Sequence, residues 1–196
     1  MSDLTIDPIV QFSDWFNDAK SMEIKNPEAM TLATATSDGR PSARMVLLKE
    51  FSTEGFIFYT NLNSNKALEL SENSQAALCF YWRSISRQVR IEGPVIRVSE
   101  GRADAYFSSR SRGSQIGAWA SDQSRTLTNR NLLEQRVKDY ESKFLGEEIP
   151  RPTFWSGYQL KPNLIEFWTE RDNRIHERQL FKLDESSVWQ VSSLYP

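Results

Sequence analysis

The sequence predicts a mainly β (α+β) fold, in which an antiparallel sheet curls or closes into a barrel flanked by helices. Three observations predict this fold. Six β-prone runs follow one another between residues 30 and 98, mostly joined by short turns, and few helical segments separate them. Residues 155–194 then return to the strand pattern. With 196 residues, the whole chain (1–196) is expected to form one domain.

The first element is expected to be an amphipathic helix. Asp7 is a good N-cap and Pro8 a good first helical residue. Apolar residues then recur at helical spacing at Ile9, Phe12, Trp15, Phe16 and Ala19, so one face should pack on the core.

A β-hairpin follows this helix. Residues 30–36 are β-prone, residues 37–40 (Ser-Asp-Gly-Arg) form a turn signal, and the chain returns as a strand over 42–51. Side chains alternate along a strand, so Arg44 and Lys49 face opposite sides and are expected at a sheet rim.

The next strand ends at Tyr59-Thr60 and leads through residues 61–64 into a helix that includes Lys66. Backbone N–H groups and a lysine at a helix start favour an anion. A hairpin followed by a capped surface helix explains the same stretch equally well.

Two further strands are expected at residues 75–82 and 87–92, with a turn between them. Gly93-Pro94 is expected to break the second strand, which resumes at residues 95–98.

A helix capped by Ser99 is expected over residues 100–109. Tyr106 and Arg110 are four residues apart and share a helical face, which Ser114 joins if the helix continues. A phenol, a guanidinium and a hydroxyl could together hold a phosphate. An arginine that satisfies the last helical carbonyls fits at least as well. The helix expected over 129–144 has the charges of a solvated face.

The last strands are expected at residues 155–160, 164–169, 174–183 and 188–194. In the third, Arg174, His176 and Arg178 fall on one face at a period of two. Such groups repel one another unless solvent, carboxylates or an anionic ligand face them. His176 is the only histidine and could transfer a proton or hydrogen-bond to a ligand, although a lone histidine also serves as a structural or solvated residue.

Composition excludes several classes of protein. No run approaches the roughly 18 apolar residues needed to span a membrane, and the first thirty residues lack a signal-peptide pattern. Cys79 is alone, so no internal disulfide forms, and a cytoplasmic setting is expected. The net charge of −2 argues against a nucleic-acid binder driven by overall charge.

The absence of common catalytic motifs narrows the chemistry. One histidine and one cysteine cannot form a zinc cluster, so no metal is expected. The chain has no G-x-S-x-G, P-loop or G-x-G-x-x-G motif. The basic and aromatic positions favour a phosphorylated ligand, with a bound cofactor supplying the reactivity.

Seven ordered motifs resemble the pyridoxamine 5'-phosphate oxidase family, over a collinear match from about Pro8 to Pro196. They are residues 44–49 (RMVLLK), 58–61 (FYTN), 87–89 (RQV), 106–110 (YFSSR), 114–119 (SQIGAW), 166–168 (EFW) and 174–178 (RIHER). The resemblance implies an FMN-binding split β-barrel and a homodimer whose site and interface are completed by strands within 155–196. It also implies that FMN takes a hydride at N5 from C4' of pyridoxamine or pyridoxine 5'-phosphate, giving pyridoxal 5'-phosphate, and that O2 reoxidises the flavin.

The resemblance also implies roles for individual residues. Those that would contact FMN are Arg44, Met45, Val46, Leu47, Leu48, Lys49, Tyr59, Thr60, Asn65, Lys66, Gln88, Gln123, Ser124, Trp168 and Arg178. Those that would hold the substrate phosphate are Lys49, Tyr106, Arg110 and Ser114. Arg174 and His176 would flank the pyridine ring as catalytic residues, with no side chain acting as a nucleophile.

The chain departs from the family pattern at two places. Asn65-Lys66 stands where the family usually has Arg-Lys, so FMN is expected to bind more weakly. Only six residues precede Asp7, so the basic, tyrosine-containing segment that covers the substrate in many members is expected to be missing.

Three other functions remain open at this stage. The first is a related split-barrel flavin oxidase that acts on another substrate, such as a phenazine precursor. The second is a non-catalytic carrier of flavin or pyridoxal phosphate. The third is nucleic-acid binding through the arginines, which the net charge disfavours.

Overall fold

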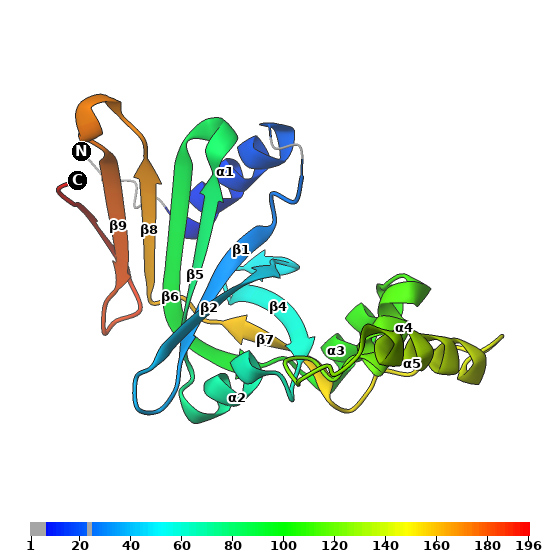
Figure 1. Ribbon diagram of the computed structural model, residues 1–196. Helices are drawn as coiled ribbons and strands as arrows, with labels where there is room; N and C mark the ends of the chain where they lie inside the picture. Colours follow the sequence, from blue (N-terminus) through cyan, green and yellow to red (C-terminus); the bar gives the residue numbers. More distant parts are fainter. Residues whose placement is uncertain (1–6, 23–24) are drawn as a thin grey trace.

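The computed structural model describes residues 7–22 and 25–196, and within them ten strands form one curled antiparallel sheet (Figure 1). The strands are β1 (Ala29–Ala35), β2 (Pro41–Leu47), β3 (Glu50–Ser52), β4 (Gly55–Asn61), β5 (Gln75–Trp82), β6 (Arg87–Arg97), β7 (Trp155–Leu160), β8 (Leu164–Thr169), β9 (Glu177–Leu183) and β10 (Trp189–Ser193). Their main order is β10-β9-β8-β6-β5-β1-β2, and β7 joins β6 to the pair β4-β3. The antiparallel, barrel-like fold expected from the sequence is confirmed.

Helix α1 (Pro8–Met22) supplies aromatic side chains to the core of this curled sheet. The Asp7 carboxylate accepts a hydrogen bond from Ile9 N at 2.8 Å, as expected of an N-cap. Phe12 is fully buried, and its ring centroid lies 4.9 Å from that of Phe51 and 4.9 Å from that of Phe56. Burying a phenylalanine contributes roughly 1.5–3 kcal/mol, so α1 is a structural part of the sheet.

The strand expected over residues 42–51 is interrupted, so that prediction is wrong. β2 ends at Leu47 and β3 begins at Glu50, because the chain changes partners between them. Leu48 N donates to Glu28 O (2.9 Å), while Lys49 N donates to Ile57 O (2.8 Å) in β4. Lys49 therefore lies at a corner where the chain passes from one part of the sheet to the other.

The break expected at Gly93-Pro94 is also wrong, because β6 is one continuous strand of 11 residues. Its first part, up to Glu92, pairs with β8, and Val95–Arg97 pair with β7. Proline is tolerated here because it lies where the strand exchanges these partners. Gly93 is needed because the carbonyl oxygen of Lys161 would lie 1.9 Å from a Cβ at this position.

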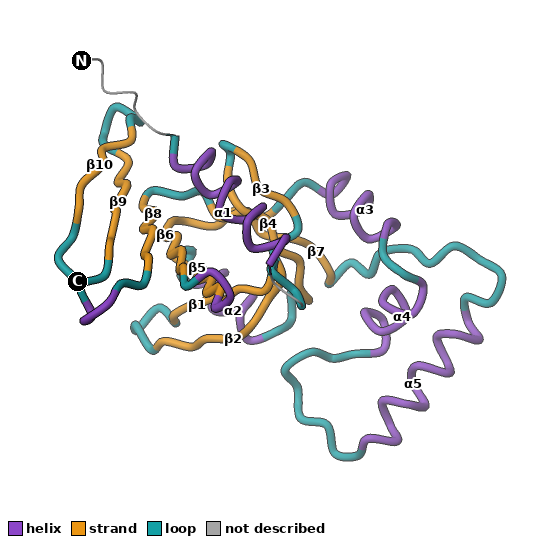
Figure 2. Tube along the Cα trace, turned by 90° about the horizontal axis from the view of Figure 1, so that it is seen from above, coloured by secondary structure: helices purple, strands orange, loops and turns teal. Residues whose placement is uncertain are grey.

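The helices after β6 form a separate layer beside the sheet (Figures 1 and 2). They are α3 (Glu100–Ser109), α4 (Arg112–Ala120) and α5 (Arg130–Lys143), while α2 (Asn65–Glu72) follows β4. Ser99 Oγ accepts from Arg102 N, which confirms the cap of α3. No residue of α5 is buried, as its charge pattern predicted. Within the described residues, no helix is long and apolar enough to cross a membrane.

Two expectations about site residues rest on helix or strand continuity, and both are wrong. α3 ends before Arg110, whose backbone is extended (φ −73°, ψ 151°), so Tyr106, Arg110 and Ser114 do not share one helical face. The strand expected from residue 174 begins at Glu177. Arg174 instead ends a 3-10 turn (Asp172–Arg174) with φ 62°, a left-handed conformation that no strand contains.

We predict that Gly93→Ala destabilises the protein by about 1–3 kcal/mol, the usual cost of overpacking, because the new methyl group meets the Lys161 carbonyl. Urea denaturation followed by tryptophan fluorescence measures the free energy of unfolding. Gly101→Ala is the matched control, since no atom lies within 4 Å of a Cβ at this position in α3. Equal stability of the two variants would contradict the close approach at Gly93.

Candidate functional site

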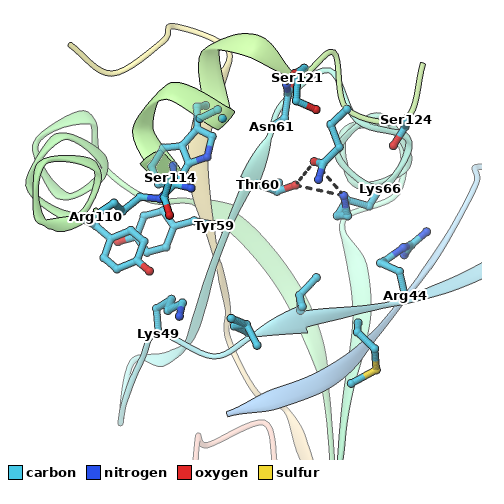
Figure 3. Close-up of a pocket in the computed structure, with 18 of the residues that line it drawn as sticks. Arg44, Lys49, Tyr59, Thr60, Asn61, Lys66, Arg110, Ser114, Ser121 and Ser124 are labelled. Atoms are coloured by element: carbon cyan, nitrogen blue, oxygen red, sulfur yellow. Dashed lines mark hydrogen bonds between the residues drawn. The ribbon is translucent and has the colours of Figure 1, made fainter. Parts of the chain in front are cut away.

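A cavity of about 760 Å³ lies between the sheet and the helical layer, where β2, β4 and the start of α2 face α3 and α4 (Figure 3). Its volume is in the range of cofactor and substrate sites. The predicted site residues that line it are Arg44, Met45, Val46, Leu47, Lys49, Tyr59, Thr60, Asn65, Lys66, Tyr106, Arg110, Ser114, Gln123 and Ser124. Segments far apart in the chain are therefore brought together around one space.

Several lining residues were not predicted: Asn61, Gly117, Ala118, Ser121 and Trp155. Gly117 and Ala118 lie three and four residues after Ser114 in α4, so helical spacing could have placed them on its face. Trp155 carries no such signal. It reaches the cavity because β7 pairs with β4, a contact between residues distant in sequence.

Lys66 is buried at the start of α2, with 7% of its surface exposed. Its ammonium donates to Thr60 Oγ1 (3.2 Å; Figure 3), Ser64 Oγ (3.2 Å) and Gln123 Oε1 (3.3 Å), all neutral oxygens. Burial, and then the positive charge of Arg44, lowers the pKa of Lys66 to about 8. A negatively charged group beside Lys66 would therefore relieve an unfavourable buried charge.

The N-terminus of α2 adds to this preference for an anion. Ser64 is the N-cap, but its side chain makes no capping hydrogen bond and instead accepts from Lys66. Asn65, the first helical residue, is exposed and lines the cavity with a neutral amide. Uncapped N–H groups at a helix start bind phosphate well.

Arg44, on β2, is held by protein acceptors. Its guanidinium donates to Leu32 O (3.2 Å), Ser42 Oγ (2.5 Å) and the carboxylate of Glu69 (3.1 Å). Hydrogen bonds from Ser42 and Thr34, together with Arg44, keep the pKa of Glu69 below its usual value although burial opposes this. Arg44 therefore has a fixed position at the rim of the cavity.

Arg110, on the other side of the cavity, is held differently. Its guanidinium carbon lies 4.8 Å from the ring centroid of Trp155 and 5.5 Å from that of Phe107. Its Nη1 is buried without a hydrogen-bond partner, and burial lowers the pKa of the guanidinium. A buried donor left unpaired costs roughly 1–3 kcal/mol, so Arg110 favours an acceptor from outside the protein.

Tyr59 and Tyr106 form a stacked pair on the same wall, with ring centroids 4.0 Å apart. Burial, and then the nearby Glu50, raises the pKa of Tyr59 to about 12, so its phenol is neutral at physiological pH. Since Tyr59 lies on β4 and Tyr106 on α3, the pair joins the sheet to the helical layer.

The remaining predicted site residues lie outside this cavity. Leu48 is buried in the core, and Gln88, Trp168 and Arg178 are cross-strand neighbours on β6, β8 and β9. His176 lies against Trp168, with ring centroids 4.6 Å apart, and Arg174 is exposed in the preceding turn. His176 and Arg178 line a second cavity of about 540 Å³, which shares no lining residue with the first.

Two of these residues have fixed orientations. Arg178 Nε donates to the buried carboxylate of Glu166 (2.7 Å), and its Nη1 donates to Tyr195 O (3.0 Å). Arg171 N donates to His176 Nδ1 at 3.2 Å, so Nδ1 is the acceptor and Nε2 is the ring nitrogen left to donate. The expectation of a missing covering segment concerns residues 1–6, which lie outside the described residues.

Comparison with family models matches nearly the whole chain. Residues 16–144 match the model described as pyridoxamine 5'-phosphate oxidase. Residues 155–196 match the model described as pyridoxine 5'-phosphate oxidase C-terminal dimerisation region.

Curated relatives and solved structures agree with these matches. A pyridoxine/pyridoxamine 5'-phosphate oxidase of Sphingopyxis alaskensis is 52% identical over 97% of this chain and 88% of its own. The protein of the same name from Nostoc sp. is 48% identical over 100% of this chain and 92% of its own length. The crystal structure of PhzG from Burkholderia lata in complex with tetrahydrophenazine-1-carboxylic acid is 33% identical, with a TM-score of 0.93 over 99% of this chain and 95% of that one.

We predict that Lys66 makes the stability of the ligand-free protein rise with pH between about 8 and 10.5. The pKa of Lys66 is lower in the folded state than its ordinary value of 10.5, so the unfolded chain binds more protons across this window. Urea denaturation at several pH values measures the slope, and Lys66→Met should reduce it. The exposed Lys20→Met is the control and should retain it. Identical slopes for the wild type and Lys66→Met would contradict the buried charge.

Proposed function

Because the chain belongs to the pyridoxamine 5'-phosphate oxidase family, we propose that it oxidises pyridoxamine or pyridoxine 5'-phosphate to pyridoxal 5'-phosphate, with FMN as cofactor and O2 as acceptor. One observation carries the proposal. Two groups of anion-binding side chains, around Lys66 and around Arg110, line the same cavity. A phosphorylated cofactor and a phosphorylated substrate could therefore lie next to each other there.

The residues around Lys66 fit the phosphate of FMN. Lys66 offers a buried ammonium with only neutral partners, and the start of α2 offers uncapped N–H groups. Thr60, Gln123 and Ser124 line the same end of the cavity. Residues 44–47 and Lys49 would lie along the flavin. When bound there, FMN would supply the redox chemistry: it would accept a hydride from C4' of the substrate at N5 and pass the two electrons to O2, giving hydrogen peroxide.

The residues around Arg110 would hold the substrate phosphate. Arg110 has an unpaired buried donor, and Lys49, Tyr106 and Ser114 line the cavity with it. Phosphate accepts such hydrogen bonds through several oxygens. These side chains bind and orient the substrate, which is how the protein would accelerate the reaction.

A second copy of the chain would complete the site. Arg174 and His176 lie away from the cavity that holds the other expected substrate contacts, as do Gln88, Trp168 and Arg178. The C-terminal match is to a dimerisation region, which supports a homodimer in which strands 155–196 of one chain complete the site of the other. Residues 1–196 would then act as one FMN-binding unit, in which His176 Nε2–H can donate a hydrogen bond to the substrate.

A related flavin oxidase that acts on a phenazine precursor is the second candidate, since the PhzG structure superimposes on nearly the whole chain. The compound bound in that structure, tetrahydrophenazine-1-carboxylic acid, is a carboxylic acid. The four side chains around Arg110 suit a phosphate, and identity to the vitamin B6 enzymes is higher, at 48–52% against 33%. The B6 phosphates are therefore the preferred substrates. We also propose that the protein acts in the cytoplasm.

We predict that the purified protein shows flavin absorption bands that bleach when pyridoxamine 5'-phosphate is added without oxygen. Readmitting oxygen should restore the bands, consume O2 and leave an aldehyde that absorbs in the near ultraviolet. Dihydrophenazine carboxylic acids serve as the comparison substrate. Bleaching by these compounds alone would favour the phenazine enzyme, and a stable yellow protein that neither substrate bleaches would favour a carrier.

We predict opposite effects for substitutions in the two proposed groups. Lys66→Ala should weaken FMN binding by at least about tenfold, because a charge-assisted contact of about 1.5–3 kcal/mol is lost. Arg174→Ala should lower turnover far more than it weakens FMN binding. FMN affinity is measured by adding FMN to the flavin-free protein and following FMN fluorescence. Turnover is measured as the steady-state rate of oxygen consumption. Equal effects of both substitutions on both measurements would refute the assigned roles.

A further inference from the structure

The guanidinium of Arg110 is held in place without hydrogen bonds. Among the described residues, no protein acceptor takes a hydrogen bond from its side chain, and Nη1 is buried and unpaired. Arg110 also lies outside any helix, since its extended backbone joins α3 to α4. Within the part of the chain that the structure describes, its cation–π partners are the rings of Trp155 and Phe107, whose centroids lie 4.8 Å and 5.5 Å from the guanidinium carbon.

Arg44 shows the opposite arrangement within the same cavity. Its Nη1 donates to Leu32 O, and its Nη2 donates to Ser42 Oγ and Glu69. An acceptor fixes a guanidinium by occupying its N–H groups, whereas an aromatic face attracts the cation and leaves every N–H group available. Arg110 is therefore positioned in a way that keeps its donors for a ligand.

Trp155 can hold the Arg110 guanidinium in place because its own indole is fixed by packing. It is 6% exposed and begins β7. Its ring is nearly parallel to that of Tyr59 (5.2 Å, 7°) and to that of Tyr106 (6.1 Å, 11°), and the edge of Phe107 meets it at 5.1 Å. Figure 3 shows Arg110, Ser114 and Tyr59 together on one side of the cavity, across from Lys66.

We propose that Trp155 is a positioning residue for substrate binding, whose indole face holds the Arg110 guanidinium so that its free N–H groups bind the substrate phosphate. The inference rests on the proposed function, which assigns that phosphate to Arg110. Trp155 would touch neither the flavin nor the reacting carbon. Its loss should therefore raise KM and leave kcat unchanged.

The test measures binding of pyridoxal 5'-phosphate, the reaction product, to the FMN-loaded dimer by isothermal titration calorimetry. Trp155→Leu should weaken binding by about 3- to 30-fold, the range that corresponds to the loss of a cation–π contact. In an Arg110→Ala background, the same substitution should cause no further loss. Trp119→Leu is the matched control. Trp119 belongs to the helical layer and packs on Tyr140 and Phe144, but it does not line the cavity.

A second series keeps the shape of the side chain, in case Trp155→Leu does not fold. Tryptophan analogues with one, two and three ring fluorines, incorporated at position 155, withdraw electrons from the ring face with little change in size. Binding should weaken stepwise with each fluorine when Arg110 is present and stay constant in Arg110→Ala.

The outcomes separate the inference from the function on which it rests. Two results would show that Trp155 has only a packing role and would overturn the inference. One is an affinity for pyridoxal 5'-phosphate that does not change with the number of fluorines. The other is that Trp155→Leu weakens binding by the same factor with and without Arg110→Ala. A wild type that binds pyridoxal 5'-phosphate but never oxidises pyridoxamine 5'-phosphate would overturn the proposed oxidase alone. A wild type that does not bind pyridoxal 5'-phosphate would overturn both.

Discussion

The buried ammonium of Lys66 is the constraint on which the site depends. This lysine is 7% exposed, and its hydrogen-bond partners among the described residues are all neutral. Keeping it charged is therefore costly, which is why its pKa is lowered to about 8. The fold nevertheless surrounds it with Thr60 from β4, the N-cap Ser64 and Gln123 from the loop after α4. These elements come together only when the sheet and the helical layer are both in place. A bound phosphate would turn this unfavourable charge into a favourable one, which links ligand binding to the stability of the surrounding fold.

The sheet makes this arrangement possible by exchanging strand partners at two corners. At residues 48–49 the chain leaves β1 and joins β4, which places Lys49 at the cavity while Leu48 points into the core. At Gly93-Pro94, β6 leaves β8 and joins β7. β7 then brings Trp155 beside Tyr59, since residues 59 and 157 are partners in the β4-β7 ladder. The changes of strand partner at residues 48–49 and at Gly93-Pro94 therefore curl the sheet and also determine which side chains reach the cavity.

The sequence predicted well whatever depends on local pattern. The α1 helix, the strand over 75–82, the start of α3 and the solvated α5 follow from alternation, helical periodicity and capping residues. The predictions from the sequence were wrong where pairing between strands that are distant in the chain overrides the local sequence pattern. Gly93-Pro94 resembles a strand end, yet β5 pairs across it, with Ala76 opposite Gly93 and Gln75 opposite Pro94. The alternation of Arg174, His176 and Arg178 suggests a strand where left-handed residues form a turn. Most of the residues that line the cavity were predicted from the resemblance to the family, but Asn61, Gly117, Ala118, Ser121 and Trp155 were not. The position of Trp155 could not be predicted because it depends on the pairing of β7 with β4.

Different interactions hold the arginines on the two sides of the cavity: hydrogen bonds orient Arg44, and aromatic rings hold Arg110. Arg44 belongs to the sheet, where Leu32 O and Ser42 lie within reach as fixed acceptors, so hydrogen bonds can orient it. Arg110 belongs to a connection between two helices, where the neighbouring carbonyls are already used; for example, Phe107 O accepts from Gln115 Nε2 and from Arg110 N itself. Packing against rings is the remaining way to hold a cation there. Since Trp155 lies parallel to Tyr59 of β4 and meets the edge of Phe107 of α3, the rings that hold Arg110 also join the helical layer to the sheet. The spacing between the two proposed phosphate-binding groups is thus set by aromatic contacts, which leave the N–H donors of Arg110 available to a ligand.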